Sequence, residues 1–187
     1  EGVRYENPQL KVMGIESVRS STPAACKEKM KGIFTIIMNG TEEDAINYID
    51  KFREEFQTLK AEDIFFPRSV RGITKYHDAA QLYIKGSPVH VKGALLYNKL
   101  LKDKKLTNDY PLIQDGEKIK FAYLKKPNTT GGEVIAILNR LPPELQLEEY
   151  IDYDKMFQKS FIDPMSTVMS AIGWQTEHIS TLEDFFG

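Results

Sequence analysis

The sequence has few of the residues that enzymes use to bind a metal or to attack a substrate. It contains one cysteine, Cys26, which excludes an internal disulfide and a pair of thiolates on zinc. Its three histidines, His77, His90 and His178, are far apart and lack HExxH spacing, which argues against a zinc site. Cys26 lies on the apolar face of an expected helix. Because burial raises the pKa of a thiol, nucleophilic catalysis by Cys26 is disfavoured.

Long apolar runs and targeting signals are also absent. No apolar run approaches the roughly 18 residues that cross a bilayer, and no signal peptide opens the chain, so we expect a cytosolic protein without a membrane partner. A phosphate-binding loop would end in Gly-Lys-Ser/Thr, but Glu133 follows Gly131-Gly132, which indicates a turn. The chain begins at Glu1 in a run of strand-forming residues, so we expect it to be part of a longer protein.

The net charge of −2 conceals a strong segregation of charge along the chain. Residues 1–67 hold 9 Lys+Arg and 12 Asp+Glu (−3), residues 68–126 hold 13 and 5 (+8), and residues 127–187 hold 3 and 10 (−7). A basic middle segment suits the neutralisation of phosphates, with the release of their counterions. The alternative is a solvated face on which the lysines have no ligand.

Two helices are predicted in the first third of the chain. Thr22 is expected to be the N-cap of the first helix and Pro23 its first residue, with Gly40 as its end. Its apolar face consists of Cys26, Met30, Ile33, Phe34, Ile37 and Met38. Thr41 and Asp44 resemble a capping box that begins the second helix. The apolar positions of that helix are Ala45, Ile49, Phe52, Phe56 and Leu59. The two helices are expected to form an antiparallel hairpin.

The middle of the chain mixes strands and helices. A short strand is expected to end at Pro67 and to lead into a basic, polar turn, and a third helix is expected within residues 87–105, with Pro88 near its start. Residues 110–138 alternate apolar and polar side chains around turns at Asp115-Gly116 and Gly131-Gly132, which predicts a small antiparallel sheet.

One or two helices, interrupted at Pro164, are expected in residues 141–174. The predicted fold class is therefore α+β, mostly helical with a small antiparallel sheet.

Residues 8–23, PQLKVMGIESVRSSTP, resemble the segment by which family B DNA polymerases pass from the palm into the thumb. In phages of the T-even type this segment runs Pro-x-Leu-Lys-x-Met-Gly-x-Glu and ends Ser-Ser-Thr-Pro. The resemblance continues downstream in the same order. SPVHVKGALLYNKLLK resembles the thumb segment that has His, Gly and Tyr-Asn at the positions of His90, Gly93, Tyr97 and Asn98. DGEKIKFAYL resembles the Gly-Glu-Lys strand of the thumb.

The stretch YIDYD, Tyr150 to Asp154, resembles the Tyr-x-Asp-Thr-Asp signature with which these polymerases hold catalytic magnesium. However, Leu147, Tyr150, Ile151, Asp154, Phe157 and Phe161 recur at helical spacing. Asp152 and Asp154 would then lie on different faces of a helix. The sequence DYDKMFQKSFIDPM resembles instead the terminal Asp-Tyr-x5-Lys-x-Phe-Ile-x-Pro helix of the thumb, so we interpret YIDYD as a look-alike.

The resemblance implies palm-to-thumb connecting strands in residues 1–22, a thumb domain in 23–164, and a C-terminal helix with a clamp-binding tail in 165–187. The exonuclease, palm and fingers portions are not matched by any segment. The isolated chain is therefore expected to be no enzyme and to need no cofactor. Joined to those portions it would be part of a DNA-directed DNA polymerase, a nucleotidyltransferase whose palm binds magnesium, in the cytoplasm of an infected bacterial host.

The last eight residues, STLEDFFG, resemble the peptide by which such polymerases dock on a sliding clamp, Gln-x-x-aliphatic-x-x-aromatic-aromatic. Leu182, Phe185 and Phe186 have that spacing, and Ile179 stands where the box has glutamine. One helical turn would bring the apolar side chains together for burial in a groove of the clamp. The alternative is that Phe185 and Phe186 fold back onto the domain.

A thumb grips duplex DNA mainly through phosphates, so the contacts should be indifferent to sequence. Lys11 is expected near the primer or the minor groove. The further DNA-binding candidates are Arg68, Arg71, Lys75 and Tyr76 in the basic turn, and Lys92, Tyr97, Asn98, Lys99 and Lys102 on the third helix. A second hypothesis is a stand-alone adaptor that binds a clamp or another partner by its tail and does not bind DNA.

Overall fold

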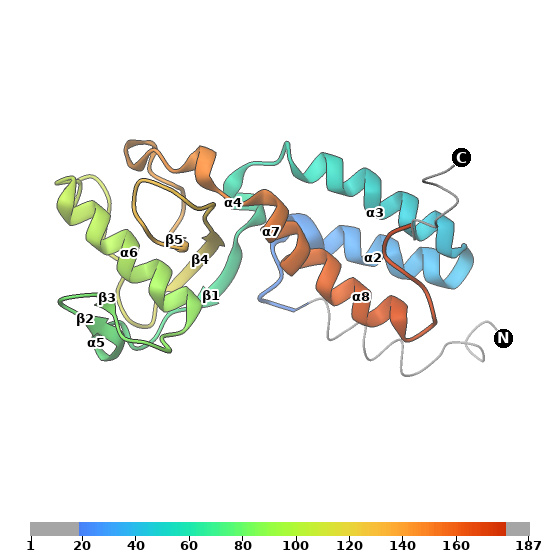
Figure 1. Cartoon of the computed structure of the whole chain (residues 1–187), viewed down its shortest axis with the longest axis horizontal. Coiled ribbons are helices and arrows are strands. Elements are labelled where there is room, and N and C mark those ends of the chain that lie inside the picture. The colour runs from blue at the N-terminus through green and yellow to red at the C-terminus, as the bar shows by residue number, and fades with distance from the viewer. Residues whose placement is uncertain (1–18, 179–187) are drawn as a thin grey trace. The chain divides into compact units, whose positions relative to one another are not determined.

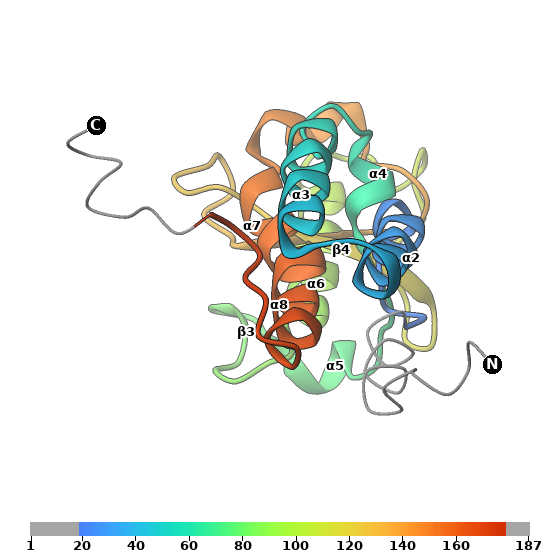
Figure 2. The same ribbon diagram turned by 90° about the vertical axis from the view of Figure 1, so that its right-hand side faces the viewer.

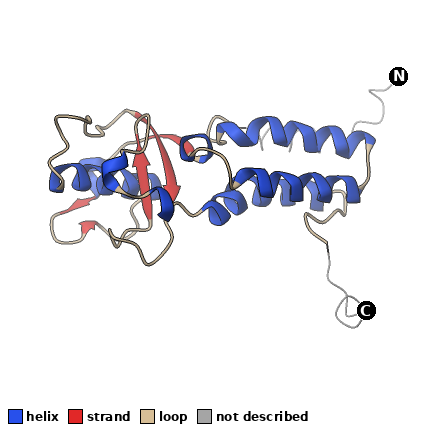
Figure 3. Ribbon diagram, turned by 90° about the horizontal axis from the view of Figure 1, so that it is seen from above, coloured by secondary structure: helices blue, strands red, loops and turns tan. Residues whose placement is uncertain are grey.

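The computed structural model describes residues 19–178, which form two compact units (Figure 1). The first unit combines residues 19–58 with residues 157–178, and the second consists of residues 59–156. The described residues confirm the predicted α+β, mostly helical class. All strands described lie in the second unit, as Figure 3 shows by colour. The domain boundaries predicted after residues 22 and 164 stay predictions.

The helical unit contains α2 (Ala24–Asn39), α3 (Glu42–Phe56), the π-helical segment η4 (Gln158–Ile162) and α8 (Asp163–Ser170). Figure 2 shows α2, α3 and α8 nearly end-on and side by side. The predicted hairpin is confirmed, since α2 packs on α3. The helix α2 ends where the Gly40 N–H donates a hydrogen bond to the Ile36 carbonyl at 2.6 Å. The capping box is also confirmed: Thr41 Oγ1 accepts from the Asp44 N–H, and Asp44 Oδ2 accepts from the Thr41 N–H.

The start of α2 differs from the prediction by one residue. Pro23, and not Thr22, is the N-cap, and no side chain caps the helix. The Thr22 hydroxyl accepts instead from the Arg19 N–H at 3.0 Å, so it closes the turn before the helix. On the predicted apolar face of α2, Cys26, Met30 and Ile33 are buried, but Met38 is 59% exposed.

A cluster of phenylalanine rings forms the centre of this unit. The rings of Phe52 and Phe56 of α3 lie 5.7 Å apart, and they meet those of Phe157 and Phe161 at centroid distances between 4.8 and 5.6 Å, edge to face. This is the geometry that the ring quadrupole favours. Two segments far apart in the sequence therefore share one core.

Cys26 lies in the same core and is fully buried, with its sulfur 3.5 Å from the Ser160 hydroxyl. Burial raises the pKa of the Cys26 thiol to about 11, against an ordinary value of 9.0. Because only the thiolate attacks, we expect Cys26 to resist a thiol reagent such as iodoacetamide in the native protein and to react fully in concentrated guanidinium chloride. Mass spectrometry of the alkylated fraction measures this, and rapid native labelling would contradict the burial.

Pro164 does not interrupt the last helix of this unit, contrary to the prediction. The π-helical turn of η4 precedes it, and the Asp163 N–H donates to the Gln158 carbonyl five residues back. Proline cannot donate to the carbonyl four residues back, and it lies here in the first turn of α8 after the wider π turn. The chain therefore continues as a helix through the proline.

The second unit is built on a three-stranded antiparallel sheet of order β1-β4-β5, formed by β1 (Phe66–Ser69), β4 (Lys118–Tyr123) and β5 (Val134–Ile137). Phe66 pairs with Phe121, and Phe121 pairs with Ala136. The sheet is confirmed, but Pro67 lies within β1 instead of ending it. Proline is tolerated there because β1 is an edge strand.

The strand expected before Asp115-Gly116 is not observed. The Ile113 N–H donates to Asn98 Oδ1, and the Ile113 carbonyl accepts from Asn98 Nδ2. Because both backbone groups of Ile113 are bound to the side chain of a helix residue, they do not pair with a strand. Strand β4 pairs instead with β1, about 50 residues earlier in the chain, and with β5, which follows it. The turn at Asp115-Gly116 connects to β1 through the Gly116 N–H, which donates to the Val70 carbonyl.

The third predicted helix is α6 (Val89–Asp103), with Pro88 as its N-cap. It packs on β5 and β4, as Figure 1 shows, and buries Val91, Ala94, Leu95 and Leu101. The remaining elements of this unit are short: α4 (Ala61–Ile64), α5 (Ile73–Tyr76), β2 (His77–Asp78), β3 (Leu82–Tyr83), η2 (Pro143–Leu145) and η3 (Glu148–Tyr150). Helix α7 (Tyr153–Phe157) ends where the chain passes between the units.

The stretch YIDYD is not a single helix, which corrects the prediction. After η3, Ile151 forms an antiparallel bridge with Leu124, and the Asp152 N–H donates to the Tyr123 carbonyl. These sheet contacts override the helical periodicity of the sequence. Asp152 Oδ1 accepts from the Lys155 N–H at 3.0 Å, so this carboxylate caps the first turn of the helix that starts at Tyr153.

Candidate nucleic-acid interface

The predicted DNA-binding residues that the structure describes all lie in the unit of residues 59–156. Arg68 lies on β1, Arg71 follows it, and Lys75 and Tyr76 lie in α5. Lys92, Tyr97, Asn98, Lys99 and Lys102 lie on α6. Since α5 contacts α6, the basic turn and the third helix are neighbours in space. Lys11 and the predicted clamp-binding residues Ile179, Leu182, Phe185 and Phe186 lie outside the described residues.

The charged side chains of this set differ in their exposure and in whether they contact an acid or an aromatic ring. Arg68, Arg71 and Lys102 are exposed and form no ion pair within residues 19–178. Lys99 is exposed but pairs with Asp103 at 2.7 Å. The Lys75 ammonium lies 5.1 Å from the centre of the Tyr76 ring, and the Lys92 ammonium lies 5.3 Å from that of Tyr83. The two arginines and Lys102 are therefore the cations most available to a phosphate.

A groove of about 700 Å³ is lined by α6 and by the segment of α5, β2 and β3. One wall is formed by Leu95, Asn98, Lys99 and Lys102 of α6, and the loop of residues 130–133 closes one side. Its charged lining comprises Lys99 and Lys102 against Asp78, Asp103 and Glu133. Because the acids outnumber the lysines, the interior of the groove is a poor site for a phosphate. Arg71 and Lys75 are exposed and do not line the groove, so they are the more favourable phosphate contacts.

Tyr97 and Asn98, two of the DNA-binding candidates on the third helix, have structural contacts within the protein, and their role in DNA binding stays a prediction. Tyr97 is 2% exposed, and its burial raises the pKa of the phenol. Both polar atoms of the Asn98 side chain bind the Ile113 backbone, at 2.9 and 2.8 Å. The helical spacing of the sequence does not predict these hydrogen bonds of Asn98, because Ile113 lies outside the helix.

We expect Asn98→Ala to lower the free energy of unfolding by about 1–3 kcal/mol. The substitution removes two hydrogen bonds and leaves the backbone of Ile113, a buried residue, without its partner. Urea unfolding and faster hydrogen exchange of the Ile113 amide measure the effect. Lys99→Ala, one residue on and exposed, is the control and should change the stability by less than about 0.5 kcal/mol. Equal effects of the two substitutions would contradict the role of the Asn98 amide.

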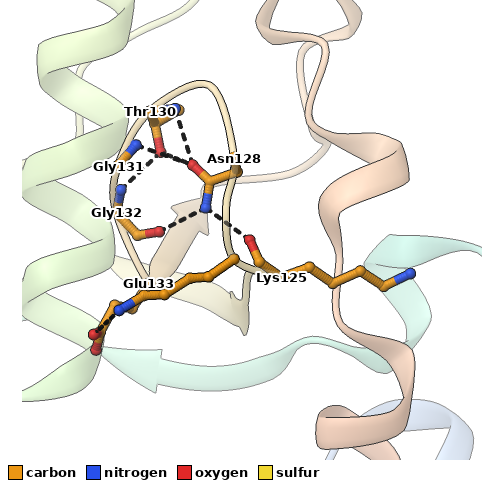
Figure 4. A network of polar contacts seen from close by, with 7 residues as sticks. Lys125, Asn128, Thr130, Gly131, Gly132 and Glu133 are labelled. Atoms are coloured by element: carbon orange, nitrogen blue, oxygen red, sulfur yellow. Dashed lines mark hydrogen bonds and ion pairs between the residues drawn. The ribbon is translucent and has the colours of Figure 1, made fainter.

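The loop after β4 is organised around Asn128, as Figure 4 shows. Asn128 Nδ2 donates to the carbonyls of Lys125 and Gly132 at 2.8 Å, and Asn128 Oδ1 accepts from the Thr130 N–H and hydroxyl and from the Gly131 N–H. Lys126 pairs with Glu133, whereas the Lys125 side chain extends away from the loop. Lys125 is an exposed cation of the basic segment that the predicted DNA-binding set does not include. The double lysine before Pro127 was the sequence signal for it.

His90, another position of the resemblance, is half-buried at the start of α6. Burial lowers the pKa of His90, and the positive charge of Arg68 lowers it further. The imidazole is therefore neutral at physiological pH, so His90 adds an aromatic ring and no positive charge to the surface of this unit.

Within residues 19–178, no three His, Cys, Asp or Glu side chains gather closely enough to hold a metal ion. Over the same residues, no helix is both long and apolar enough to pass through a lipid bilayer.

Comparisons with known proteins identify two relatives. The DNA-directed DNA polymerase of Enterobacteria phage T4 is 30% identical over 191 residues, and that of Escherichia phage RB69 is 31% identical over 192 residues. Each match covers 100% of this chain and 21% of the relative, so the chain spans about a fifth of their length. No protein-family model matches the chain. The resemblance predicted from the sequence is thus confirmed, because the chain is similar along its whole length to one segment of the T-even-type phage DNA polymerases.

Proposed function

We propose that this chain is the C-terminal thumb part of a family B replicative DNA polymerase. The observation that carries the proposal is the similarity to two phage DNA-directed DNA polymerases, which extends over the whole chain but over only 21% of each relative. A segment of that length is a part of the enzyme, and its partners are then the palm, fingers and exonuclease parts of the same polymerase. Nucleotidyl transfer and magnesium binding belong to the palm.

In this proposal the unit of residues 59–156 grips primer–template duplex through its phosphates. The exposed cations Arg68, Arg71 and Lys102, which form no ion pair within residues 19–178, support it. Lys75 and Tyr76 lie on α5, and Lys92 and Lys99 lie on α6 with Lys102. Binding by lysine and arginine releases counterions from DNA, so the affinity is independent of sequence and falls with salt. Lys11 adds a contact near the primer.

The tail, with Ile179, Leu182, Phe185 and Phe186, tethers the polymerase to a sliding clamp. Burial of each large apolar side chain in a clamp groove contributes roughly 1.5–3 kcal/mol before ordering costs. Tethering keeps the enzyme at the primer end by effective concentration and so confers processivity during DNA replication. The site of action is the cytoplasm of the infected bacterial host.

Fluorescence anisotropy of a labelled primer–template duplex, titrated with the chain over a salt series, tests the DNA grip. The proposal expects equal affinity for unrelated sequences and a log–log slope that corresponds to several phosphates. The adaptor hypothesis expects no duplex binding at any salt concentration. Deleting residues 182–187 should abolish clamp binding under both hypotheses, so that experiment tests the tail alone.

A further inference from the structure

Four aromatic rings gather on one face of the sheet in the unit of residues 59–156. Phe66 and Phe121 are register partners on β1 and β4, and their rings stack at 5.2 Å with an angle of 27° between their planes. Tyr123 lies two residues further along β4, on the same face, with its ring 6.3 Å from that of Phe121. The His90 ring of α6 lies 6.3 Å from that of Phe121.

The four rings differ in exposure. Phe121 is 6% exposed and anchors the cluster in the core. Phe66, His90 and Tyr123 are half-buried. Each of their rings contacts the ring of Phe121, so the four rings form one continuous aromatic surface.

Positive charge lies beside these rings. Arg68 is exposed on the same face of β1 as Phe66, two residues away. It is close enough to lower the pKa of His90 beyond the effect of burial. It also opposes the rise in the pKa of Tyr123 that burial causes. On the other side, the exposed Lys155 places its ammonium 4.5 Å from the centre of the Tyr123 ring.

We propose that Phe66, His90 and Tyr123, with Arg68 and Lys155, form a stacking surface that binds the unpaired nucleotides of single-stranded DNA. Stacking uses the face of a base, which an intact duplex does not offer, and it tolerates any base. The two cations bind the phosphates that link the stacked nucleotides. The two positive charges favour a polyanion over an apolar peptide.

This inference goes beyond the proposed duplex grip, since phosphate contacts need no aromatic ring and no unpaired base. The surface would hold a strand that has separated from its partner. Arg68 is common to both proposals, so the test uses the rings.

The test compares binding of labelled oligothymidine of about 12 nucleotides, within the usual site size of stacking surfaces, to the wild-type chain and to variants. Phe66→Leu and Tyr123→Leu should each weaken this binding by about 5-fold to 100-fold, because each removes one stacking ring. Tyr123→Phe keeps the ring and should preserve the affinity. Affinity for a blunt, fully paired duplex should change by less than about twofold in all three variants, since phosphate contacts are retained.

A matched control is Tyr48→Leu. Tyr48 is also a half-buried tyrosine with a lysine ammonium near its ring, at 5.6 Å, but it belongs to the helical unit. This substitution should leave oligothymidine binding unchanged. Equal losses from Tyr48→Leu and Tyr123→Leu, or undiminished binding by Phe66→Leu and Tyr123→Leu, would overturn the stacking surface. Duplex binding without oligothymidine binding would overturn it as well and leave the proposed function intact.

A measurement on the wild-type chain avoids any dependence on the folding of the variants. Oligothymidine that contains 5-iodouracil crosslinks on irradiation to aromatic side chains that stack on the modified base. Mass spectrometry should find the crosslinks on the peptides of Phe66, His90 or Tyr123. Crosslinks confined to other peptides would overturn the proposal.

Discussion

Replacing Arg68, Arg71 and Lys75 together with glutamate is expected to lower the affinity for primer–template duplex by at least about 100-fold at low salt. All three side chains are exposed, and Arg68 and Arg71 have no ion-pair partner in the described part of the chain. If each contacts one phosphate, the log–log slope of affinity against salt should also fall in magnitude by about 3. Anisotropy titrations at several salt concentrations measure both quantities.

The control for this variant changes net charge by the same amount on the other unit. Lys27, Lys31 and Lys51 lie on α2 and α3, and their reversal should lower the affinity much less. If both triple variants bound equally weakly, the loss would come from the net charge of the chain and not from a local site. That result would contradict the location of the proposed grip.

Gly93→Ala is expected to lower the free energy of unfolding by about 1–3 kcal/mol, although alanine favours helices more than glycine does. A Cβ atom at Gly93 would lie 2.9 Å from the Ala136 nitrogen and 3.0 Å from the Ile135 carbonyl carbon. These are backbone atoms of β5, which cannot rotate away. The helix would have to move off the sheet, and urea unfolding monitored by circular dichroism measures the loss.

Gly32→Ala is the matched control for that substitution. Gly32 also lies inside a helix, and its added Cβ would meet the hydroxyl end of the Tyr48 side chain. Because a tyrosine side chain can rotate and a strand cannot, Gly32→Ala should cost less than Gly93→Ala. The reverse order would show that contact between α6 and β5 does not limit the stability of its unit.

The sequence predicted the elements whose evidence is local. The capping box of Thr41 and Asp44, and the long helices α2, α3 and α6, depend on residues three or four positions apart. The pairing of β4 with β1 depends on contacts across about 50 residues, and the sequence pattern offered nearer candidates around Asp115. The spacing of apolar residues along the sequence shows which segments are strands but not which distant strands pair.

The candidate site shows the same division. The charge of residues 68–126 is evident from composition, and it directed attention to β1, α5 and α6. Composition did not show that Tyr97 is buried or that Asn98 holds the Ile113 backbone. Nor did it bring Phe66, His90 and Tyr123 together, since these rings come from three elements.

The shared phenylalanine core of the helical unit has a consequence for synthesis on the ribosome. Phe52 and Phe56 emerge about 100 residues before Phe157 and Phe161, so α2 and α3 leave the exit tunnel without their partners. The segment of residues 59–156 is complete before those partners are made, and domains generally fold as units during synthesis. The inserted unit is therefore expected to fold first. Until the final helix arrives, the nascent hairpin carries an uncovered apolar face, which is the kind of surface that chaperones bind.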